Sequence, residues 1–497
     1  MTTQSVADWR QLAGSVAIPD QAFIDGRSVP AQSGATMACV YPGDGRVVAQ
    51  VAACDAGDVD TAVHAARRSF QAGAWSRCAP MERKKVLLRL SELILAHRDE
   101  LAILETLNVG KPVTNSSTGD IPSAANCIAW YAEAIDKVYG EVAATAWDMT
   151  TLVIREPVGV VAAVVPWNYP LSMAAWKLGP ALATGNSVVL KPAEQSPFTA
   201  LRLGQLALEA GIPPGVLNVV PGLGETAGRA LGLHMDVDCV AFTGSTEVGK
   251  YFMQYSGQSN IKRIGLELGG KSPQIVLADC TDLDAAATAI ANGIFANSGQ
   301  VCNAGSRLIV DEAVKESLLA KVLERASALK PGDPLDPKTR MGSLVTKEHM
   351  ERVLRYVTQG VDAGAKLLVG GERTLMNSGG YFVGPTVFDQ VRNDMTIARE
   401  EIFGPVLSTI TVKGIDEALH VANETIYGLA ASVWTNDVKA ALRAAKAIRA
   451  GVVWVNCFDR GLMSVPFGGF KQSGFGRDKS LHAMDKYTDL KAIWLAH

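Results

Sequence analysis

The sequence lacks most features that mark membrane, secreted or metal-binding proteins. No stretch approaches the roughly 18 uninterrupted apolar residues that a membrane span needs. The first ten residues have neither a basic start nor an apolar core, so they do not resemble a secretory signal. The eight cysteines include no C-x-x-C pair, which argues against a zinc site and against a disulfide framework. These absences predict a cytoplasmic protein without a resident metal.

An excess of charge of one sign is also missing. The 47 Lys and Arg residues nearly balance the 50 Asp and Glu residues, which leaves a formal net charge of −3. We therefore expect neither a nucleic-acid partner nor a membrane partner. At 497 residues the chain is too long for one hydrophobic core and should divide into two or three domains.

Short apolar runs alternate with helical patterns from residue 158 onward. The runs cover residues 158–165, 187–190, 216–220 and 237–242, and a second series begins near 272 and continues to 466. Strands that alternate with helices predict parallel βαβ units with helices on both faces of the sheet. Ligands bind beyond the carboxyl ends of such strands. The polar residues at those ends are Asn168, Lys191, Glu194 and Ser245.

The remaining segments predict simpler elements. Residues 20–55 indicate hairpin-like strands, residues 59–72 a helix that Asp58 caps, and residues 80–107 one long helix. The β-like stretch at 150–155 has no obvious partner nearby, so it should pair with a distant segment or another subunit.

One cysteine, Cys302, lies among small and polar residues. A structural cysteine usually lies in an apolar run, whereas Gly299, Asn303 and Gly305 leave room for a ligand to approach this sulfur. A nucleophilic thiol needs that access, together with neighbours that favour the thiolate. This stretch alone also allows a buried, inert cysteine.

Three further polar residues each allow two interpretations. Glu267 is flanked by leucines, which suits a general base with a raised pKa, or it is a solvated strand end. Glu401 lies in a turn, where it could bind a ribose diol or stay solvated. The Asn168 amide could donate to a developing oxyanion, or it could serve its proline-bounded turn.

Two glycine loops come close to nucleotide-binding fingerprints without matching them. The loop at 222–228 is one residue longer than the dinucleotide fingerprint, so it indicates an ordinary strand-to-helix turn. The loop at 244–250 nearly spells a P-loop, but Tyr251 stands where Ser or Thr must hold magnesium. What remains is a helix N-terminus at which Ser245 can face a pyrophosphate.

Seven motifs, in this order, make the chain similar to the aldehyde dehydrogenase superfamily over nearly its whole length. Each motif is weak singly, but their combination is specific. The chain is most similar to the aminoaldehyde, guanidinobutyraldehyde and γ-glutamyl-aminobutyraldehyde dehydrogenase group. The motifs are Pro166-Trp-Asn168-Tyr-Pro, Lys191-Pro-Ala-Glu194, Phe242-Thr-Gly-Ser245-Thr-Glu-Val-Gly249, Leu266-Glu267-Leu-Gly-Gly-Lys, Gly299-Gln-Val-Cys302, Glu401-Ile-Phe403-Gly-Pro and Pro466-Phe467-Gly-Gly-Phe-Lys-Gln-Ser-Gly.

The resemblance implies a covalent mechanism. The Cys302 thiolate would attack the aldehyde carbon, and the Asn168 amide with the Cys302 backbone N–H would hold the oxyanion. Hydride transfer would leave a thioester, which water activated by Glu267 would hydrolyse. Lys177 and Asp478 would belong to a proton path, although a glutamate is frequent where this chain has Asp478, and the shorter side chain leaves that relay open.

The resemblance also implies NAD as the cofactor, with NADP possible. Lys191 and Glu194 would bind the adenosine ribose, and the anionic Glu194 disfavours a 2′-phosphate. Ser245 would bind the pyrophosphate, and Glu401 with Phe403 would position the nicotinamide riboside. Further residues expected against the cofactor are Trp167, Gly224 and Gly244.

The implied fold is α/β, with two Rossmann-like open domains and a small β element for oligomerisation. Residues 1–139 and 156–267 would form the NAD-binding domain and residues 268–467 the catalytic domain. Residues 140–155 and 484–497 would form the oligomerisation element of a homodimer or homotetramer.

The implied substrate is an aldehyde with a cationic tail, because two carboxylates with aromatic neighbours suit ion pairing and cation–π contact. Candidates are 4-guanidinobutyraldehyde, 4-aminobutyraldehyde and γ-glutamyl-aminobutyraldehyde, from polyamine or arginine catabolism. Alternatives are a betaine aldehyde or broad aliphatic aldehyde dehydrogenase and, from a different class, a non-catalytic NAD-binding structural protein. Asp120 could instead cap a helix that begins at Ile121. The residues placed along the substrate tunnel are Asp120, Tyr169, Met173, Trp176, Asp459 and Phe467.

Overall fold

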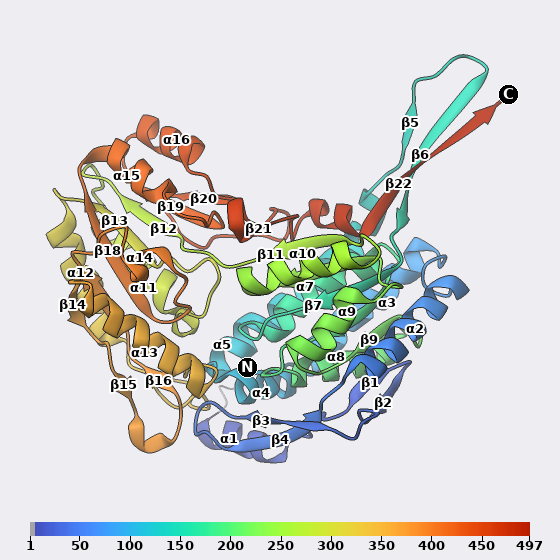
Figure 1. Cartoon of the computed structure of the whole chain (residues 1–497), viewed down its shortest axis with the longest axis horizontal. Helices are drawn as coiled ribbons and strands as arrows, with labels where there is room; N and C mark the ends of the chain where they lie inside the picture. The colour runs from blue at the N-terminus through green and yellow to red at the C-terminus, as the bar shows by residue number, and fades with distance from the viewer. Residues whose placement is uncertain (1–4) are drawn as a thin grey trace.

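Two open α/β sheets, each covered by helices, account for most of the computed structural model, which describes residues 5–497 (Figure 1). The first sheet has eight strands in the order β2-β1-β9-β8-β7-β10-β11-β21. Its centre is parallel, as the alternating pattern predicts. The strands are β1 (Ala22–Ile24), β2 (Arg27–Val29), β7 (Val160–Val164), β8 (Ser187–Lys191), β9 (Leu217–Val219), β10 (Cys239–Thr243), β11 (Arg263–Glu267) and β21 (Gly474–Phe475).

The second sheet has seven strands in the order β14-β17-β18-β13-β12-β19-β20. All neighbours are parallel except the edge strand β14. The predicted α/β class with two open sheets is therefore confirmed, while the division into domains by residue number stays a prediction. The strands are β12 (Pro273–Val276), β13 (Arg307–Asp311), β14 (Lys366–Val369), β17 (Thr386–Asp389), β18 (Val406–Val412), β19 (Ala430–Trp434) and β20 (Val452–Val455).

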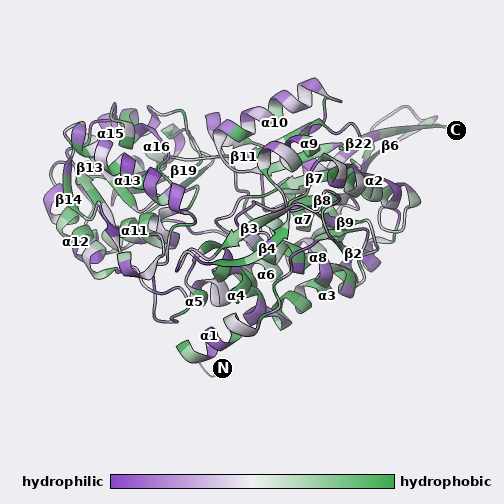
Figure 2. Ribbon diagram, turned by 60° about the horizontal axis from the view of Figure 1, so that its bottom comes forward, coloured by the Kyte–Doolittle hydropathy of each residue, from purple (hydrophilic) through white to green (hydrophobic). Residues whose placement is uncertain are grey.

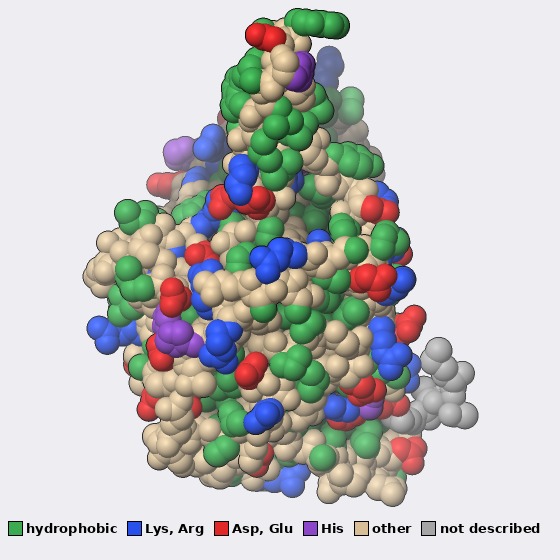
Figure 3. Space-filling view, turned by 90° about the vertical axis from the view of Figure 1, so that its right-hand side faces the viewer, with side chains coloured by type: hydrophobic (Ala, Val, Ile, Leu, Met, Phe, Trp, Pro, Cys, Tyr) green, Lys and Arg blue, Asp and Glu red, His purple; other side chains and the backbone are tan. Residues whose placement is uncertain are grey.

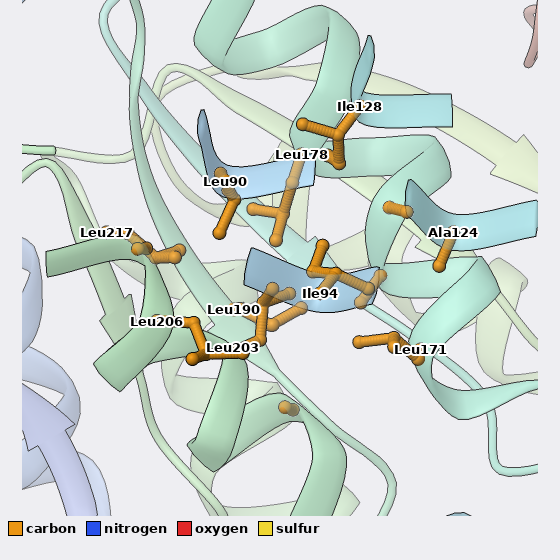
Figure 4. Close-up of a cluster of buried hydrophobic side chains, with 14 of the residues drawn as sticks. Leu90, Ile94, Ala124, Ile128, Leu171, Leu178, Leu190, Leu203, Leu206 and Leu217 are labelled. Atoms are coloured by element: carbon orange, nitrogen blue, oxygen red, sulfur yellow. The ribbon is translucent and has the colours of Figure 1, made fainter. Parts of the chain in front are cut away.

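Apolar side chains of the helices pack on both faces of the first sheet. One face carries a large cluster in which Leu90 and Ile94 meet Leu178, Leu190 and Leu206 (Figure 4). Hydrophobic strands lie inside this lobe, and hydrophilic faces of the helices lie outside (Figure 2). The helices on this face are α3 (Pro80–Ala96), α6 (Ile121–Ala134), α7 (Pro170–Ala183) and α8 (Phe198–Ala210), and those on the other are α2 (Ala56–Ala72), α9 (Arg229–Leu233) and α10 (Thr246–Gln258).

The second sheet is covered in the same way. Helices α11 (Leu283–Phe295) and α12 (Lys315–Ala328) share one apolar cluster, and the helices of the other face share another. That second group comprises α13 (Lys347–Asp362), α14 (Thr396–Arg399), α15 (Gly414–Asn423) and α16 (Val438–Ala447).

Two helix boundaries differ from the sequence-based expectation. The helix predicted at 59–72 is α2, which begins at Ala56. Its N-cap is Asp55, whereas Asp58 is the third helical residue and completes a capping box. The predicted single helix at 80–107 is wrong, because the chain breaks at His97 between α3 and α4 (Arg98–Val109). The His97 ring lies 2.6 Å from a Glu100 carboxylate oxygen. No helix-breaking residue stands at this position, so the sequence pattern does not predict the break.

A three-stranded arm projects from the first lobe, at the upper right of Figure 1. The strand β6 (Met149–Pro157) has the distant partner that the sequence predicts, because it pairs along its whole length with β22 (Thr488–Ala496). The short β5 (Glu141–Ala143) covers its other edge. Apolar side chains gather on the arm (Figure 3), among them Trp147 at 99% exposed and Trp494 at 62%. No helix within residues 5–497 is long and apolar enough to cross a membrane.

Candidate active site

The carboxyl edge of the first sheet brings the predicted residues together. Strands β7, β10 and β11 are neighbours, so the turns that follow them open on the same side. A cavity of about 490 Å³ lies there, between the two sheets, and is lined by Asn168, Ser245, Glu267 and Cys302 among others. Residues far apart in the chain thus share one chamber, in which an organic ligand can contact all of them.

The loop before Cys302 has an unusual backbone. Asn297, Ser298 and Gly299 all adopt positive φ angles, which non-glycine residues seldom do. The Ser298 hydroxyl donates to the Gly342 carbonyl at 2.9 Å, and Gln300 accepts from the Val345 N–H at 3.0 Å. At Gly299 an added Cβ would lie 2.1 Å from the Gly404 carbonyl oxygen, so only glycine fits. The surrounding structure therefore holds the cysteine loop in a strained, defined position.

The paired glycines after Glu267 let two further segments approach the chamber. A Cβ on Gly269 would lie 2.3 Å from a Glu401 carboxylate oxygen, and a Cβ on Gly270 would lie 2.4 Å from the Cys302 carbonyl. The Gly270 N–H donates to Glu401 at 2.9 Å. The motif thus brings the nucleophile loop and Glu401 next to the end of β11.

Cys302 is accessible but is not activated by charge. Its side chain is half-buried and lines the cavity. Burial, together with the nearby carboxylates of Glu401, Glu267 and Asp459, raises the pKa of Cys302 to about 12. A nucleophilic thiol needs neighbours that favour the thiolate, and among the main contributions here the Asn303 backbone N–H is the only group that lowers this pKa.

Asn168 is buried and held in place. Its side-chain amide donates to the Gln300 carbonyl at 2.9 Å, and its own carbonyl accepts from the Asn297 amide at 3.1 Å. Because an amide carries two N–H bonds, the second remains available to an oxygen in the cavity. The residue therefore ties its turn to the cysteine loop and can also serve as an oxyanion donor.

Glu267 lies at the end of β11 and is only 5% exposed. The interpretation of Glu267 as a solvated strand end is therefore wrong. Burial raises the pKa of Glu267 well above its ordinary value, and Asp478 raises it further against the opposing effect of Lys177. Neither carboxyl oxygen has a hydrogen-bond partner within residues 5–497. Such a group can accept a proton near neutral pH, as a general base must.

Lys177 and Asp478 form a buried ion pair at 2.5 Å, despite the shorter acidic side chain. A second lysine, Lys486, which the sequence reading missed, also pairs with Asp478. Burial alone would raise the pKa of Asp478, but the two lysines outweigh it and lower that pKa. The cluster lies close enough to Glu267 to alter its pKa, but no hydrogen bond joins them within the described chain.

The predicted cofactor residues divide into two groups. Trp167, Gly244, Ser245, Glu401 and Phe403 line the cavity. Ser245 is the N-cap of α10 and lines the cavity, so the N-terminus of that helix lies at the edge of the chamber. The rings of Trp167 and Phe403 meet edge to face at 5.3 Å. Glu401 is half-buried and accepts the Gly270 N–H, so it does not lie in a solvated loop, and burial raises its pKa to about 7.

The second cofactor group lies farther along the same edge. Lys191 ends β8, and its ammonium lies 3.8 Å from the Glu194 carboxylate. Gly224 begins the helical turn that follows β9 and is open around its Cα. These three residues do not line the cavity around Cys302, which agrees with a ligand that extends from the chamber toward β8 and β9.

The substrate side of the cavity differs from the expectation at Asp120. This residue has a helical backbone and makes no capping hydrogen bond, so the helix-cap interpretation is wrong. Its carboxylate instead pairs with buried Lys111, a residue the sequence reading missed, whose ammonium lies 3.8 Å from the Tyr169 ring centre. Lys111 also lies 3.4 Å from Glu105, whose pKa burial raises well above its ordinary value. The negative charge of Asp120 is therefore already compensated by Lys111.

The remaining predicted residues form an aromatic wall with a polar end. Met173 and Trp176 lie on α7, and the Trp176 ring meets Phe467 at 5.4 Å. Asp459 accepts from the Asn303 amide at 2.9 Å. Lys479, which no sequence pattern singles out although it follows Asp478 directly, faces this wall.

Comparison with known proteins agrees with this geometry. The model for the "Aldehyde dehydrogenase family" matches residues 29–493. The chain is 49% identical over 496 residues to the "NADP/NAD-dependent aldehyde dehydrogenase PuuC" of Escherichia coli (strain K12), an alignment covering 100% of this chain and 99% of that protein. An indole-3-acetaldehyde dehydrogenase solved with NAD⁺ has a TM-score of 0.99 at 56% identity, with full coverage of both chains. The γ-glutamyl-γ-aminobutyraldehyde dehydrogenase of Burkholderia cenocepacia J2315 has a TM-score of 0.97 at 56% identity, covering 99% of this chain and 100% of that one.

Proposed function

The chain belongs to the aldehyde dehydrogenase family and is an NAD-dependent aldehyde dehydrogenase, and we propose that its substrates are aldehydes derived from ω-amines. The observation that carries the catalytic assignment is the shared cavity of Cys302, Asn168 and Glu267. The oxidised product is a carboxylate, and one aldehyde, one NAD⁺ and one water yield one carboxylate, one NADH and two protons.

Cys302 acts as the nucleophile in this proposal. After losing its proton, the sulfur adds to the aldehyde carbon and forms a thiohemiacetal. The free N–H of the Asn168 amide and the Cys302 backbone N–H stabilise the oxygen that becomes negative. When that carbon loses a hydride, the sulfur remains bound to it as a thioester.

Glu267 supports the second half of the reaction. Its unpartnered carboxylate takes a proton from a water molecule, and the water oxygen attacks the thioester carbon. The carbon–sulfur bond then breaks, which releases the carboxylate and restores Cys302. A free carboxyl group at this position favours hydrolysis over transfer of the acyl group to another thiol.

NAD, when bound, supplies the hydride acceptor. The residues fit it: the Ser245-capped helix N-terminus offers amides to a pyrophosphate, and the buried Thr243 hydroxyl has no partner within residues 5–497. Lys191 and Glu194 would hold the adenosine ribose, and Glu401 with Phe403 would hold the nicotinamide riboside. The carboxylate of Glu194 favours NAD over NADP, because it repels a 2′-phosphate.

The substrate class is supported by similarity to a γ-glutamyl-γ-aminobutyraldehyde dehydrogenase over nearly the whole chain. The class includes 4-aminobutyraldehyde, 4-guanidinobutyraldehyde and their γ-glutamylated relatives, formed in polyamine or arginine catabolism. An aromatic aldehyde is the second candidate, because Trp176 and Phe467 form an aromatic wall and one neighbour is an indole-3-acetaldehyde dehydrogenase.

We also propose a homo-oligomer in the cytoplasm. Apolar side chains rarely stay exposed in such numbers on a monomer, and β22 and β5 each leave an edge of the arm open. The arm of one subunit would bury these groups against another subunit. Its exposed apolar residues include Val142, Trp147, Leu490, Trp494 and Leu495.

The proposal is tested by following NADH formation with purified protein. 4-Aminobutyraldehyde, 4-guanidinobutyraldehyde, γ-glutamyl-aminobutyraldehyde, betaine aldehyde, indole-3-acetaldehyde and hexanal are compared by kcat/KM. We expect the highest kcat/KM for one of the ω-amine derivatives, and no NADH from Cys302→Ala with any aldehyde. A kcat/KM for hexanal equal to that of the best ω-amine derivative would overturn the substrate class, and turnover by Cys302→Ala would overturn the nucleophile.

A further inference from the structure

A lysine of the protein itself fills the aromatic corner of the substrate cavity. The Lys479 ammonium lies 4.5 Å from the centre of the Trp176 ring and 5.6 Å from that of Phe467. These are the two rings at which a cationic substrate tail would bind by cation–π contact. Because Lys479 already occupies that position, a second cation there would meet like charge.

The other charges of the cavity also disfavour a cationic ligand. The carboxylate of Asp120 is paired with Lys111. The acidic group left near the corner is Asp459, which accepts a hydrogen bond from Asn303 and also attracts the Lys479 ammonium. Burial lowers the pKa of Lys479, and Asp459 opposes that effect. Two cations, Lys479 and Arg460, line the same end of the cavity. With Asp459 set against Lys479, Arg460 leaves this end of the cavity with one more cation than anion, which reverses the expectation of an acidic tunnel.

The backbone holds Lys479 in this position. Lys479 and Ser480 both adopt positive φ angles, 58° and 51°, which two successive non-glycine residues rarely do. Asp478, directly before them, is anchored by its paired lysines, and its N–H and carbonyl bond Phe467 at 2.7 and 2.8 Å. The Tyr131 hydroxyl donates to the Ser480 carbonyl at 3.2 Å. A strained pair of residues held from both sides is typical of a functional site.

We propose that Lys479 is a specificity residue that binds a carboxylate at the far end of the substrate. The preferred substrate is then an aldehyde whose ω-amine carries a carboxylate-bearing acyl group through an amide bond. Acylation removes the amine's positive charge, which the lysine disfavours, and adds the anion that it attracts. This inference rests on the proposed function and narrows its substrate class.

A matched pair of substrates tests the proposal. N-succinyl-4-aminobutyraldehyde and N-butyryl-4-aminobutyraldehyde have acyl groups of equal chain length and differ by a terminal carboxylate in place of a methyl group. We expect the wild-type enzyme to favour the succinyl compound over the butyryl compound, and both over free 4-aminobutyraldehyde. In Lys479→Met the succinyl-to-butyryl ratio of kcat/KM should fall roughly tenfold, the size of one charged hydrogen bond, and the change should lie in KM.

Two further variants make the result specific. Lys479→Arg keeps the charge and should retain most of the ratio. Lys439→Met removes an exposed lysine on α16, far from the cavity lining, and should leave the ratio unchanged. A ratio that does not move in Lys479→Met, while all three ω-amine aldehydes are oxidised, would overturn the role of Lys479 alone. Oxidation of hexanal in preference to all three would overturn the proposed substrate class as well.

Discussion

Replacing Glu267 by Gln should separate the two halves of the reaction. Gln keeps the size and shape of the side chain, but its amide oxygen is a far weaker base. Glu267 is 5% exposed and neither of its oxygens has a hydrogen-bond partner within residues 5–497, so the substitution breaks no hydrogen bond between this side chain and the described protein. The variant should fold normally, form the thioester and then fail to hydrolyse it.

The expected loss follows from the role of the base. A positioned general base contributes about 10²–10⁴-fold to a rate, which corresponds to about 2.7–5.4 kcal/mol at 1.36 kcal/mol per tenfold. We expect the steady-state kcat to fall by that factor, whereas the first turnover should persist as a burst of one NADH per active site.

The pH dependence adds a second signature. Burial raises the pKa of Glu267 well above its ordinary value, so the fraction of ionised base increases as the pH rises. The wild-type hydrolysis rate should therefore rise with pH until Glu267 is ionised. Glu267→Gln has no group to titrate at this position and should lack that rise.

Rapid mixing with NADH absorbance measures the burst and the steady state together, and mass spectrometry of the quenched protein detects the acyl group on Cys302. Glu324→Gln, which removes an exposed carboxylate on α12, is the matched control. A variant with no burst would show that Glu267 acts before the thioester forms. A kcat within tenfold of the wild type would show that it is not the general base.

Two other predictions concern the ion-pair cluster and the arm. Asp478→Asn leaves the buried Lys177 and Lys486 without their shared carboxylate, so calorimetry should show a loss of about 3–5 kcal/mol; a loss below about 1 kcal/mol would contradict a stabilising pair. The double substitution Leu490→Lys with Trp494→Lys places charge on the exposed face of β22. Light scattering should then report a smaller assembly than the wild type, and an unchanged mass would remove the arm from the interface.

Local patterns determined the fold class and most of the site. Alternating apolar runs and helical segments predict parallel sheets because each pattern depends on neighbours a few residues away. The same holds for the turns after those strands, so the pattern predicts Asn168, Lys191, Glu194 and Ser245 at the carboxyl edge of the first sheet, where the structure has them. The order of the seven motifs then indicates the family.

Side-chain pairing between distant segments was decided only by the tertiary structure. Lys177 meets Asp478 across 301 positions of the chain, and Asn303 meets Asp459 across 156. The charge that a carboxylate presents depends on such partners: Asp120 looked free in the sequence but is paired with Lys111, and the aromatic corner looked vacant but faces Lys479. Packing and backbone register set these contacts, and neither is encoded in the residues that adjoin each side chain.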